Sequence, residues 1–195
     1  LEGILKERGV EFFYKTEILN FKTENDFIKS AITTNGETIT ADYFVIANGC
    51  DAPDLLKHVD VKCDIFPVRG YSYTFNIEKS NYAPFIGLID REKRMVYSLY
   101  KTYLRVAGFM DLGINTPDKI ALRMKDFENE IFTSFPLLKR NTIVHKWTDN
   151  RPFTPSSVPI VGTPKEFKNL AINAGHGALG FTLSFGTGKL ISDLI

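Results

Sequence analysis

The glycines near the end of the chain are spaced as in loops that hold nucleotide cofactors. Asn173–Ile195 reads NAGHGALGFTLSFGTGKLISDLI, and Gly175–Gly180 fits the pattern G-x-G-x-x-G. Glycines let a ligand approach the backbone, and a helix that begins there would point unpaired N–H groups at an anion or at an oxygen gaining negative charge. The segment is therefore a candidate cofactor turn. A tight turn, with Gly186 and Gly188 permitting close helix packing, is the alternative.

The pattern lacks the surroundings of a complete dinucleotide-binding unit. Such a unit needs a strand before the glycines, a helix after them, a second parallel strand and an acidic residue about 20 residues further on. A strand is predicted over Asn169–Asn173 and a helix after the glycines, where leucines recur at helical spacing. The second strand and the acid have no counterpart, so we expect a glycine-rich helix start without its nucleotide-binding unit.

A second candidate is an arginine placed between aromatic residues and a proline. Trp147–Pro155 reads WTDNRPFTP, so Arg151 directly precedes Pro152. A guanidinium group presents paired N–H donors that match a carboxylate, and the rigid proline would help to aim it. Two interpretations stay open: recognition of a substrate carboxylate, or a structural ion pair with Asp149 or another acid.

Tyrosines and a proline-led strand offer weaker signals. Tyr97, Tyr100 and Tyr103 are predicted to stand on neighbouring strands, where their hydroxyls could contact a ligand or their rings could simply pack. Phe66–Tyr73 (FPVRGYSY) resembles an edge strand entered through proline. We interpret this strand as plain architecture.

Composition and absent motifs narrow the class of function. The 195 residues are 44% hydrophobic and 24% charged with a net charge of +1, typical of a globular protein and without the basic excess of a nucleic-acid binder. The three histidines are scattered and Cys50 and Cys63 lack paired ligand spacing, so we expect no metal site and a reducing compartment. No G-x-S-x-G element indicates a serine hydrolase. An enzyme would therefore rely on an organic cofactor, and no catalytic side chain is assigned.

Periodicity predicts an α+β fold. Predicted strands cover Val10–Tyr14, Ile18–Thr23, Phe27–Thr34, Tyr43–Ala47, Val61–Val68, Tyr71–Ile77, Phe85–Ile89, Arg94–Tyr100 and Leu104–Met110. Asn35-Gly36 signals a hairpin, and helices are expected at Ala52–His58 and from Thr116-Pro117 onward. Lys146–Gly162 carries three prolines and is predicted to be a constrained loop leading into a short strand. The chain opens with Leu1 in a helical pattern, so we expect a fragment whose N-terminal part is absent.

Four stretches in order resemble one known family. They are TITADYFVIANGCDAPDL, FPVRGYSYTF, KWTDNRPFTPSSVPIVG and NLAINAGHGALGFTLSFGTGKLISDLI. Together they cover nearly the whole chain and are similar to the D-amino-acid oxidase-like (DAO) family of FAD-dependent oxidoreductases. Within it, the bacterial D-amino-acid dehydrogenases resemble the chain most, and glycine oxidases are neighbours.

The resemblance implies a division into domains. Residues 1–49 would be part of a FAD-binding domain of glutathione-reductase-like type, here without its opening nucleotide-binding unit. Residues 50–162 would form a substrate-binding domain with a mixed β-sheet. Residues 163–195 would supply the return strand and the C-terminal helix of the FAD-binding domain.

The resemblance also implies site residues. Contacts to FAD are expected from Ile18, Ala47, Asn48 and Gly49, and, around the pyrimidine end of the flavin, from His176, Gly177, Ala178, Leu179, Gly180, Phe181 and Thr182. Arg151 would bind the substrate α-carboxylate, and Tyr97, or alternatively Tyr100, would contact the substrate. No cysteine lies in Pro152–Ser157, where relatives attach flavin covalently, so the FAD should be non-covalent.

The implied reaction is oxidative deamination of D-amino acids to 2-oxo acids by hydride transfer to flavin N5. It needs no side-chain base if the amine binds unprotonated. The implied partners are an amino-acid substrate and a respiratory-chain electron acceptor, and the location is cytoplasmic or peripheral on the inner face of the membrane. Three alternatives stay open: a non-catalytic remnant that cannot hold FAD alone, a glycine or secondary-amine oxidase, and another flavoprotein branch such as a monooxygenase.

Overall fold

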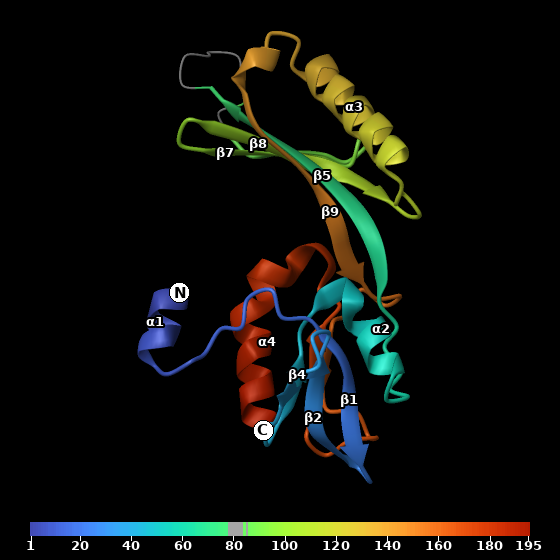
Figure 1. Cartoon of the computed structure of the whole chain (residues 1–195). Helices are drawn as coiled ribbons and strands as arrows, with labels where there is room; N and C mark the ends of the chain where they lie inside the picture. The colour runs from blue at the N-terminus through green and yellow to red at the C-terminus, as the bar shows by residue number, and fades with distance from the viewer. Residues whose placement is uncertain (78–83, 85) are drawn as a thin grey trace. The chain divides into compact units, whose positions relative to one another are not determined.

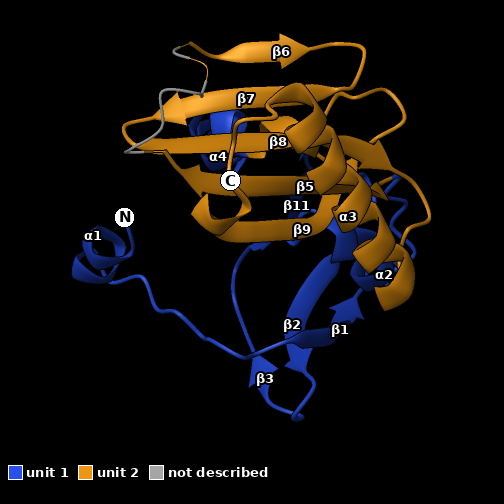
Figure 2. Ribbon diagram, turned by 90° about the horizontal axis from the view of Figure 1, so that it is seen from above, with its two compact units in different colours: residues 1–64, 160–174, 181–195 blue, residues 65–159, 175–180 orange. Residues whose placement is uncertain are grey.

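The computed structural model describes residues 1–77, 84 and 86–195, which form two compact units (Figures 1 and 2). Unit 1 comprises Leu1–Asp64, Ile160–Ala174 and Phe181–Ile195, and unit 2 comprises Ile65–Pro159 and Gly175–Gly180. Each unit combines helices with sheet, in line with the predicted α+β class. The predicted boundaries at 49/50 and 162/163 differ from the changes of unit at 64/65 and 159/160.

Unit 1 contains two small sheets. Its elements in chain order are α1 (Glu2–Glu7), β1 (Ile18–Glu24), β2 (Phe27–Thr33), β3 (Thr38–Ile39), β4 (Phe44–Ile46), η1 (Gly49–Asp51), α2 (Ala52–Lys57), β10 (Ile160–Gly162), β11 (Leu170–Ala174) and α4 (Gly180–Leu194). Strands β1, β2 and β3 form an antiparallel meander, while β11 pairs antiparallel with β10 and parallel with β4. The hairpin predicted at Asn35-Gly36 is confirmed, with Gly36 at φ +86°.

A buried amide side chain joins the two sheets of unit 1. Asn169, next to the start of β11, accepts a hydrogen bond from the N–H of Ile28 (2.8 Å) and donates to its carbonyl (2.8 Å). It also donates to the carbonyl of Asp42 (3.1 Å). Because a buried polar group must be hydrogen-bonded, this triple pairing fixes β2 against the segment that leads into β4.

Unit 2 is built on one larger sheet. Its elements are β5 (Phe66–Asn76), β6 (Leu88–Asp90), β7 (Met95–Tyr100), β8 (Tyr103–Asp111), α3 (Pro117–Ser134), η2 (Arg140–Thr142), β9 (Ile143–Phe153) and η3 (Gly177–Leu179). The strand order is β6-β7-β8-β5-β9 (Figure 2), and every described pairing is antiparallel. The mixed sheet predicted for this region is therefore wrong, since the mixed sheet is the small one of unit 1.

Helix α3 covers one face of this sheet with an aromatic core. Tyr71, Tyr73 and Phe75 alternate along β5 and are almost fully buried. Phe127 of α3 packs on them, with ring centroids 6.0 Å from Tyr71 and 5.8 Å from Tyr73. The helix predicted from Thr116-Pro117 onward is confirmed, and α3 begins at Pro117.

Three predicted strands or loops differ from the structure. The strand predicted at Phe66–Tyr73 is an interior strand rather than an edge, because β5 pairs with β8 and β9. The loop predicted from Lys146 is wrong, since β9 continues through Pro152. Proline is tolerated there because β9 lies at the sheet edge, where a missing N–H costs little. Val10–Tyr14 forms no strand, and Phe85 of the strand predicted at Phe85–Ile89 lies outside the described residues. No helix in the described ranges is long and apolar enough to cross a membrane.

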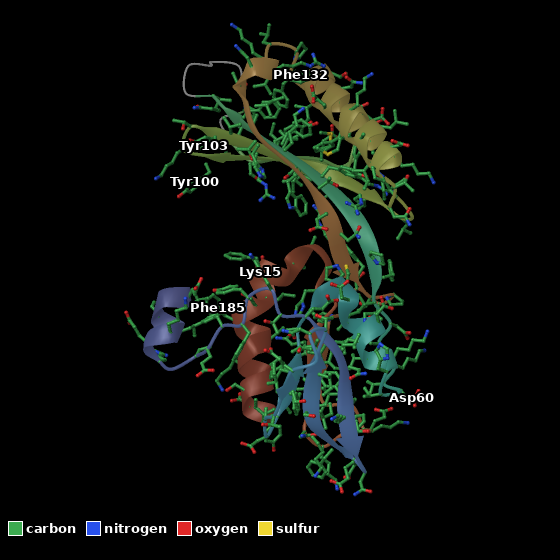
Figure 3. All side chains as sticks on the ribbon, in the orientation of Figure 1. Lys15, Asp60, Tyr100, Tyr103, Phe132 and Phe185 are labelled. Atoms are coloured by element: carbon green, nitrogen blue, oxygen red, sulfur yellow. The ribbon has the colours of Figure 1, made fainter. Side chains whose placement is uncertain are left out.

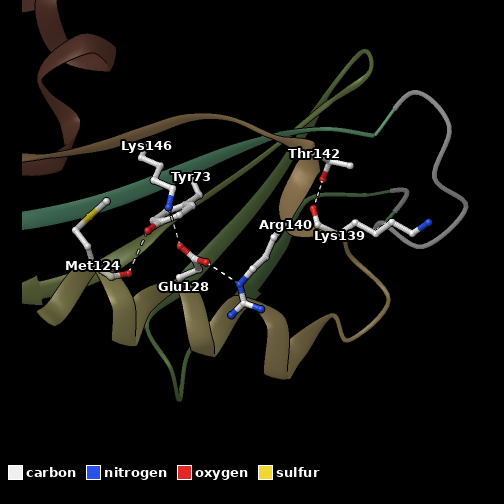
Figure 4. A network of polar contacts seen from close by, with 7 residues as sticks. All are labelled: Tyr73, Met124, Glu128, Lys139, Arg140, Thr142 and Lys146. Carbon is white, nitrogen blue, oxygen red and sulfur yellow. Dashed lines mark hydrogen bonds and ion pairs between the residues drawn. The ribbon is translucent and has the colours of Figure 1, made fainter. Parts of the chain in front are cut away.

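A polar network joins α3 to η2 and β9 (Figure 4). The Glu128 carboxylate accepts hydrogen bonds from Arg140 Nε and Lys146 Nζ, both at 2.9 Å, and its side chain is 16% exposed. The Lys146 ammonium lies 4.9 Å from the centroid of the Tyr73 ring. Burial raises the pKa of Glu128, but hydrogen bonds from Lys146, Arg140 and Tyr73 together outweigh it, so the pKa lies below its usual value.

Replacement of Glu128 by Gln should make the free energy of unfolding less dependent on pH in the acidic range. Because the folded-state pKa is depressed, the carboxylate stabilises the fold above its unfolded pKa near 4.5, and this contribution is lost as pH falls through the folded pKa. We expect Glu128→Gln to lower the free energy of unfolding by about 1–2 kcal/mol at pH 7, and the difference to shrink in acid. Urea unfolding over a pH series measures this. The exposed Glu92→Gln is the control, and equal effects of the two variants at pH 7 would contradict the prediction.

Candidate functional site

Two of the segments expected to hold a cofactor lie at one edge of the mixed sheet in unit 1. Strands β4 and β11 run parallel with Ile46 opposite Ile172, so Ala47 and Asn173 follow at the same edge. The carboxyl ends of parallel strands are where α/β sheets bind ligands. Asn48 and Gly49 continue from Ala47 into η1, and Gly49 takes a positive φ of +64°.

A pocket of about 640 Å³ opens beside this edge. Its lining includes Ile18, Ala47 and Asn48, three of the residues expected to contact FAD, but not Gly49. Three carboxylates also line it, those of Glu17, Asp51 and Asp54. Carboxylates repel phosphate and accept hydrogen bonds, so the pocket suits hydroxyl or amine donors.

Asn173 carries an unsatisfied acceptor at the same edge. Its side-chain oxygen Oδ1 is buried and accepts no hydrogen bond from the described residues. A buried polar atom without a partner costs free energy, so a ligand that donates a hydrogen bond to this oxygen would be favoured.

In unit 2, the sheet face opposite α3 carries Arg151 over a strand of small side chains. The side of β5 away from the buried aromatic residues carries Val68, Gly70, Ser72 and Thr74. This face of the sheet, on the side away from α3, is here called the open face. Arg151 lies opposite Val68 and shares their face. A Cβ added at Gly70 would lie 2.2 Å from Arg151 Cζ, so the guanidinium group rests directly on the glycine backbone.

The Arg151 guanidinium has no anionic partner within 4.0 Å among the described residues. The ion pair with Asp149 that the sequence left open is not formed among the described residues, and the Asp149 carboxylate accepts the N–H of Asn150 at 2.7 Å. Cζ lies 6.0 Å from the Trp147 ring centroid. Burial, and secondly the charge of Arg105, lower the pKa of Arg151. A half-buried cation in this setting would gain from a carboxylate ligand.

The two candidate tyrosines point to opposite faces of the sheet. Tyr97 lies under α3 and is 2% exposed, with its ring centroid 5.0 Å from that of Phe135. Tyr100 comes three residues later on β7, pairs with Tyr103 on β8 and is 70% exposed on the face away from α3 (Figure 3). Tyr100, and not Tyr97, therefore shares a face with Arg151.

The glycine-rich turn packs against the end of β9. A Cβ at Gly175 (φ +80°) would lie 2.7 Å from Thr154 Cγ2, and one at Gly177 (φ +54°) 3.0 Å from the Phe153 ring. Phe153 and Arg151 are two residues apart on β9, so their side chains share a face. Phe153, which contacts the turn, therefore lies on the same face of the unit 2 sheet as Arg151.

The remaining predicted cofactor residues follow this turn. Burial lowers the pKa of His176. Ala178 and Leu179 lie in η3 and are exposed, and the helix predicted after the glycines is α4, which begins at Gly180. Phe181 and Thr182 lie in the first turn of α4, in unit 1, and both are exposed.

Gly70, Phe153 and the acidic pocket lining were missed by the sequence analysis. Only for Gly70 did the sequence carry a signal, since small residues alternate with aromatic ones through GYSYTF. The packing of Phe153 on the turn and the grouping of the acids depend on residues distant in sequence.

Gly175→Ala should be more destabilising than a substitution at a glycine of similar backbone conformation. Both Gly175 and Gly113 have positive φ, but a Cβ at Gly113 meets nothing within 4 Å. We expect about 1 kcal/mol loss for Gly113→Ala from backbone strain, and about 2–3 kcal/mol for Gly175→Ala, which also displaces Thr154. Chemical denaturation measures both. Equal losses would show that the turn is not packed against β9.

The family match and the most similar curated proteins agree on one family. A family described as FAD dependent oxidoreductase (DAO) matches residues 1–194. A D-amino acid dehydrogenase of Granulibacter bethesdensis is 35% identical over 196 residues, covering 100% of this chain and 46% of that protein. One from Paramagnetospirillum magneticum is 34% identical with the same coverages. The chain therefore spans about half the length of the curated relatives it matches.

Solved structures share the fold. Glycine oxidase from Bacillus cereus superposes with a TM-score of 0.77 at 23% identity, over 95% of this chain and 51% of that one. L-proline dehydrogenase from P. horikoshii gives 0.77 at 21% identity, over 97% and 51%. At such identities the likeness concerns the fold alone. With the family match over nearly its whole length, the chain belongs to the DAO family of FAD-dependent oxidoreductases, whose cofactor is FAD.

Proposed function

We propose that this chain is the substrate-binding part, and a portion of the FAD-binding part, of an enzyme that oxidises D-amino acids to 2-oxo acids and ammonia. The observation that carries the proposal is the Arg151 guanidinium, which is half-buried on the open face of unit 2 and has no anionic partner among the residues that the structure describes. The D-amino acid dehydrogenase relatives, at 34–35% identity, support the substrate class.

Arg151 is proposed to anchor the substrate α-carboxylate. Its planar fork of donors matches a carboxylate, and the absence of a side chain at Gly70 leaves space for the guanidinium group. Tyr100 is proposed as the tyrosine on the substrate side because it shares that face. Binding then contributes chiefly by orientation, since a fixed carboxylate limits where the substrate Cα can lie.

The residues of unit 1 fit the adenosine end of FAD. The pocket beside Ile18, Ala47 and Asn48 has the volume of a small-ligand site. Its carboxylates would accept hydrogen bonds from ribose hydroxyls or the adenine amine, and the Asn173 oxygen lacks a donor at the same edge. The first turn of α4, with Gly180 at its start, is proposed to stabilise charge at the flavin pyrimidine. Unit 1 is accordingly assigned to the FAD-binding domain and unit 2 to the substrate domain.

FAD, when bound, supplies the acceptor for the hydride that leaves the substrate Cα. The chain's own part is to hold the carboxylate and exclude alternative poses, and no side-chain base is assigned. The substrate amine must therefore bind unprotonated, and the resulting imino acid hydrolyses in water to the 2-oxo acid and ammonia. For the complete protein we propose a respiratory-chain electron acceptor and a cytoplasmic or inner-membrane peripheral location, by analogy with dehydrogenase relatives.

Loss of Arg151 should abolish productive substrate binding. In the complete protein carrying FAD, anaerobic mixing with D-alanine should bleach the flavin absorbance. Arg151→Ala should raise the substrate concentration needed by about 100-fold or more, because a charge-assisted bidentate contact is lost. Gly70→Ala should weaken binding similarly while leaving the unfolding midpoint nearly unchanged, because its Cβ displaces only the far end of the Arg151 side chain.

A panel of substrates and a matched control separate the alternatives. Arg94→Ala, exposed at the turn before β7, should bind D-alanine as the wild type does. Bleaching by glycine or sarcosine in preference to D-amino acids would replace the proposal by a small-amine oxidase. If dithionite bleaches the flavin and no amino acid does, the assignment of substrate class is wrong. Fast bleaching of the flavin in Arg151→Ala would show that Arg151 does not anchor the substrate carboxylate.

A further inference from the structure

A second arginine projects from the open face of unit 2. Arg105 lies on β8 between Leu104 and Val106, which are both fully buried in the core that packs against α3. Side chains alternate along a strand, so Arg105 points to the opposite side of the sheet, the face that carries Arg151. Arg105 is exposed and lies opposite Thr74 of β5. The open face thus holds two guanidinium groups, one from each strand that flanks β5.

A row of hydrogen-bond donors crosses the open face at Arg105. The row, here called the donor row, has one residue on each of four neighbouring strands. Its members lie opposite one another and are Ser98 of β7, Arg105 of β8, Thr74 of β5 and His145 of β9. Hydroxyl, guanidinium and imidazole groups can all donate hydrogen bonds, and the row contains no carboxylate. Such a set of side chains suits a ligand that brings acceptors, above all an anion.

Neither arginine of the open face is neutralised by the residues that the structure describes. The arginine ion pairs formed there belong to Arg123 and Arg140. Asp149 also lies on the open face, but its carboxylate pairs with neither Arg105 nor Arg151. Burial, and secondly the charge of Arg105, lower the pKa of Arg151. The two cations therefore destabilise each other, and a ligand with two negative charges would relieve both.

The distance along β5 fits a small molecule with an anionic group at each end. The Arg151 guanidinium lies over Gly70, and the donor row crosses β5 at Thr74, four residues further on. At about 3.3 Å per residue, these two positions on β5 are roughly 13 Å apart. Between them, β5 is flanked by Ala107 on one side and by Trp147 on the other. Charge-assisted hydrogen bonds of about 2.8 Å at each end leave space for the carbon chain of an amino acid.

We propose that the donor row binds a second carboxylate of the substrate, and that the enzyme therefore acts on acidic D-amino acids such as D-glutamate. This inference rests on the proposed function, because it takes Arg151 as the anchor of the α-carboxylate. Arg105 binds the side-chain carboxylate and determines specificity, while the hydroxyl and imidazole groups of the row supply further donors. The reaction at the substrate Cα stays as proposed above, and the class of side chain is narrowed.

D-glutamate and D-glutamine test the second carboxylate, since the two differ in charge but hardly in shape. In the complete protein carrying FAD, anaerobic bleaching of the flavin should reach half its maximal rate at a concentration about 10-fold lower, or more, for D-glutamate. Arg105→Met should raise that concentration for D-glutamate by about 10–100-fold and leave it within about twofold for D-glutamine, because one charge-assisted contact is lost. Arg105→Lys keeps the charge and should retain part of the preference.

Two controls separate a specific contact from a general effect. Arg91→Met, exposed in the turn after β6, should leave the response to both substrates as in the wild type. Arg105→Met should keep the wild-type midpoint of urea unfolding, because the side chain that it replaces is exposed. If D-glutamate has no advantage in the wild type, or if Arg105→Met weakens both substrates equally, the inference is wrong. Bleaching by either substrate would still support the proposed function.

Binding without turnover distinguishes failure of the inference from failure of the proposed function. Glutarate carries two carboxylates and valerate carries one on a chain of equal length, and neither has an amine to be oxidised. Isothermal titration calorimetry should show glutarate binding about 10-fold more tightly than valerate, and Arg105→Met should remove the difference. Equal binding of the two acids by the wild type would overturn the second carboxylate site. If glutarate is preferred and no amino acid bleaches the flavin, the donor row remains an anion site, but the proposed reaction and the acidic D-amino-acid substrate are both wrong.

Discussion

The alternation of side chains along β5 is the constraint on which the rest of unit 2 depends. One set, Tyr71, Tyr73 and Phe75, is buried beneath α3 and holds the helix to the sheet. The intervening set is small, which leaves room above the other face for the long side chain of Arg151. A shift of register by one residue would exchange the two sets and would remove the aromatic core and the guanidinium position together.

The candidate sites of the two units carry opposite charge. The open face of unit 2 presents the partly desolvated Arg151 guanidinium, which lacks an anionic partner within the described ranges and therefore favours a carboxylate. The pocket of unit 1 is lined by carboxylates and favours hydroxyl and amine donors. A difference in charge of this kind limits which ligand each site can accept.

Local signals in the sequence predicted most elements but not their faces and partners. Turn and cap residues such as Asn35-Gly36 and Pro117 act within a few positions, so the hairpin and α3 begin where expected. The prolines after Lys146 led to the wrong prediction of a loop. Proline is tolerated in a strand at a sheet edge, and the local sequence does not show which strand lies at the edge. The choice between Tyr97 and Tyr100 likewise required the position of α3. Arg151 and the glycine-rich turn were candidates from residue type and spacing, and the family resemblance supplied their expected roles. The alternation of small and aromatic residues marked Gly70, but its contact with Arg151 required the pairing of two strands.

The contact of Gly70 with Arg151 also shapes how this site can evolve. The glycine is required only while the arginine occupies the space above it. Once the arginine is lost, a β-branched residue at position 70 would strengthen the strand, since glycine within a strand is unfavourable. Return of the arginine would then be blocked by the new side chain. The effect of a substitution at Gly70 therefore depends on whether Arg151 is present. Loss of carboxylate recognition at this site would be difficult to reverse in evolution.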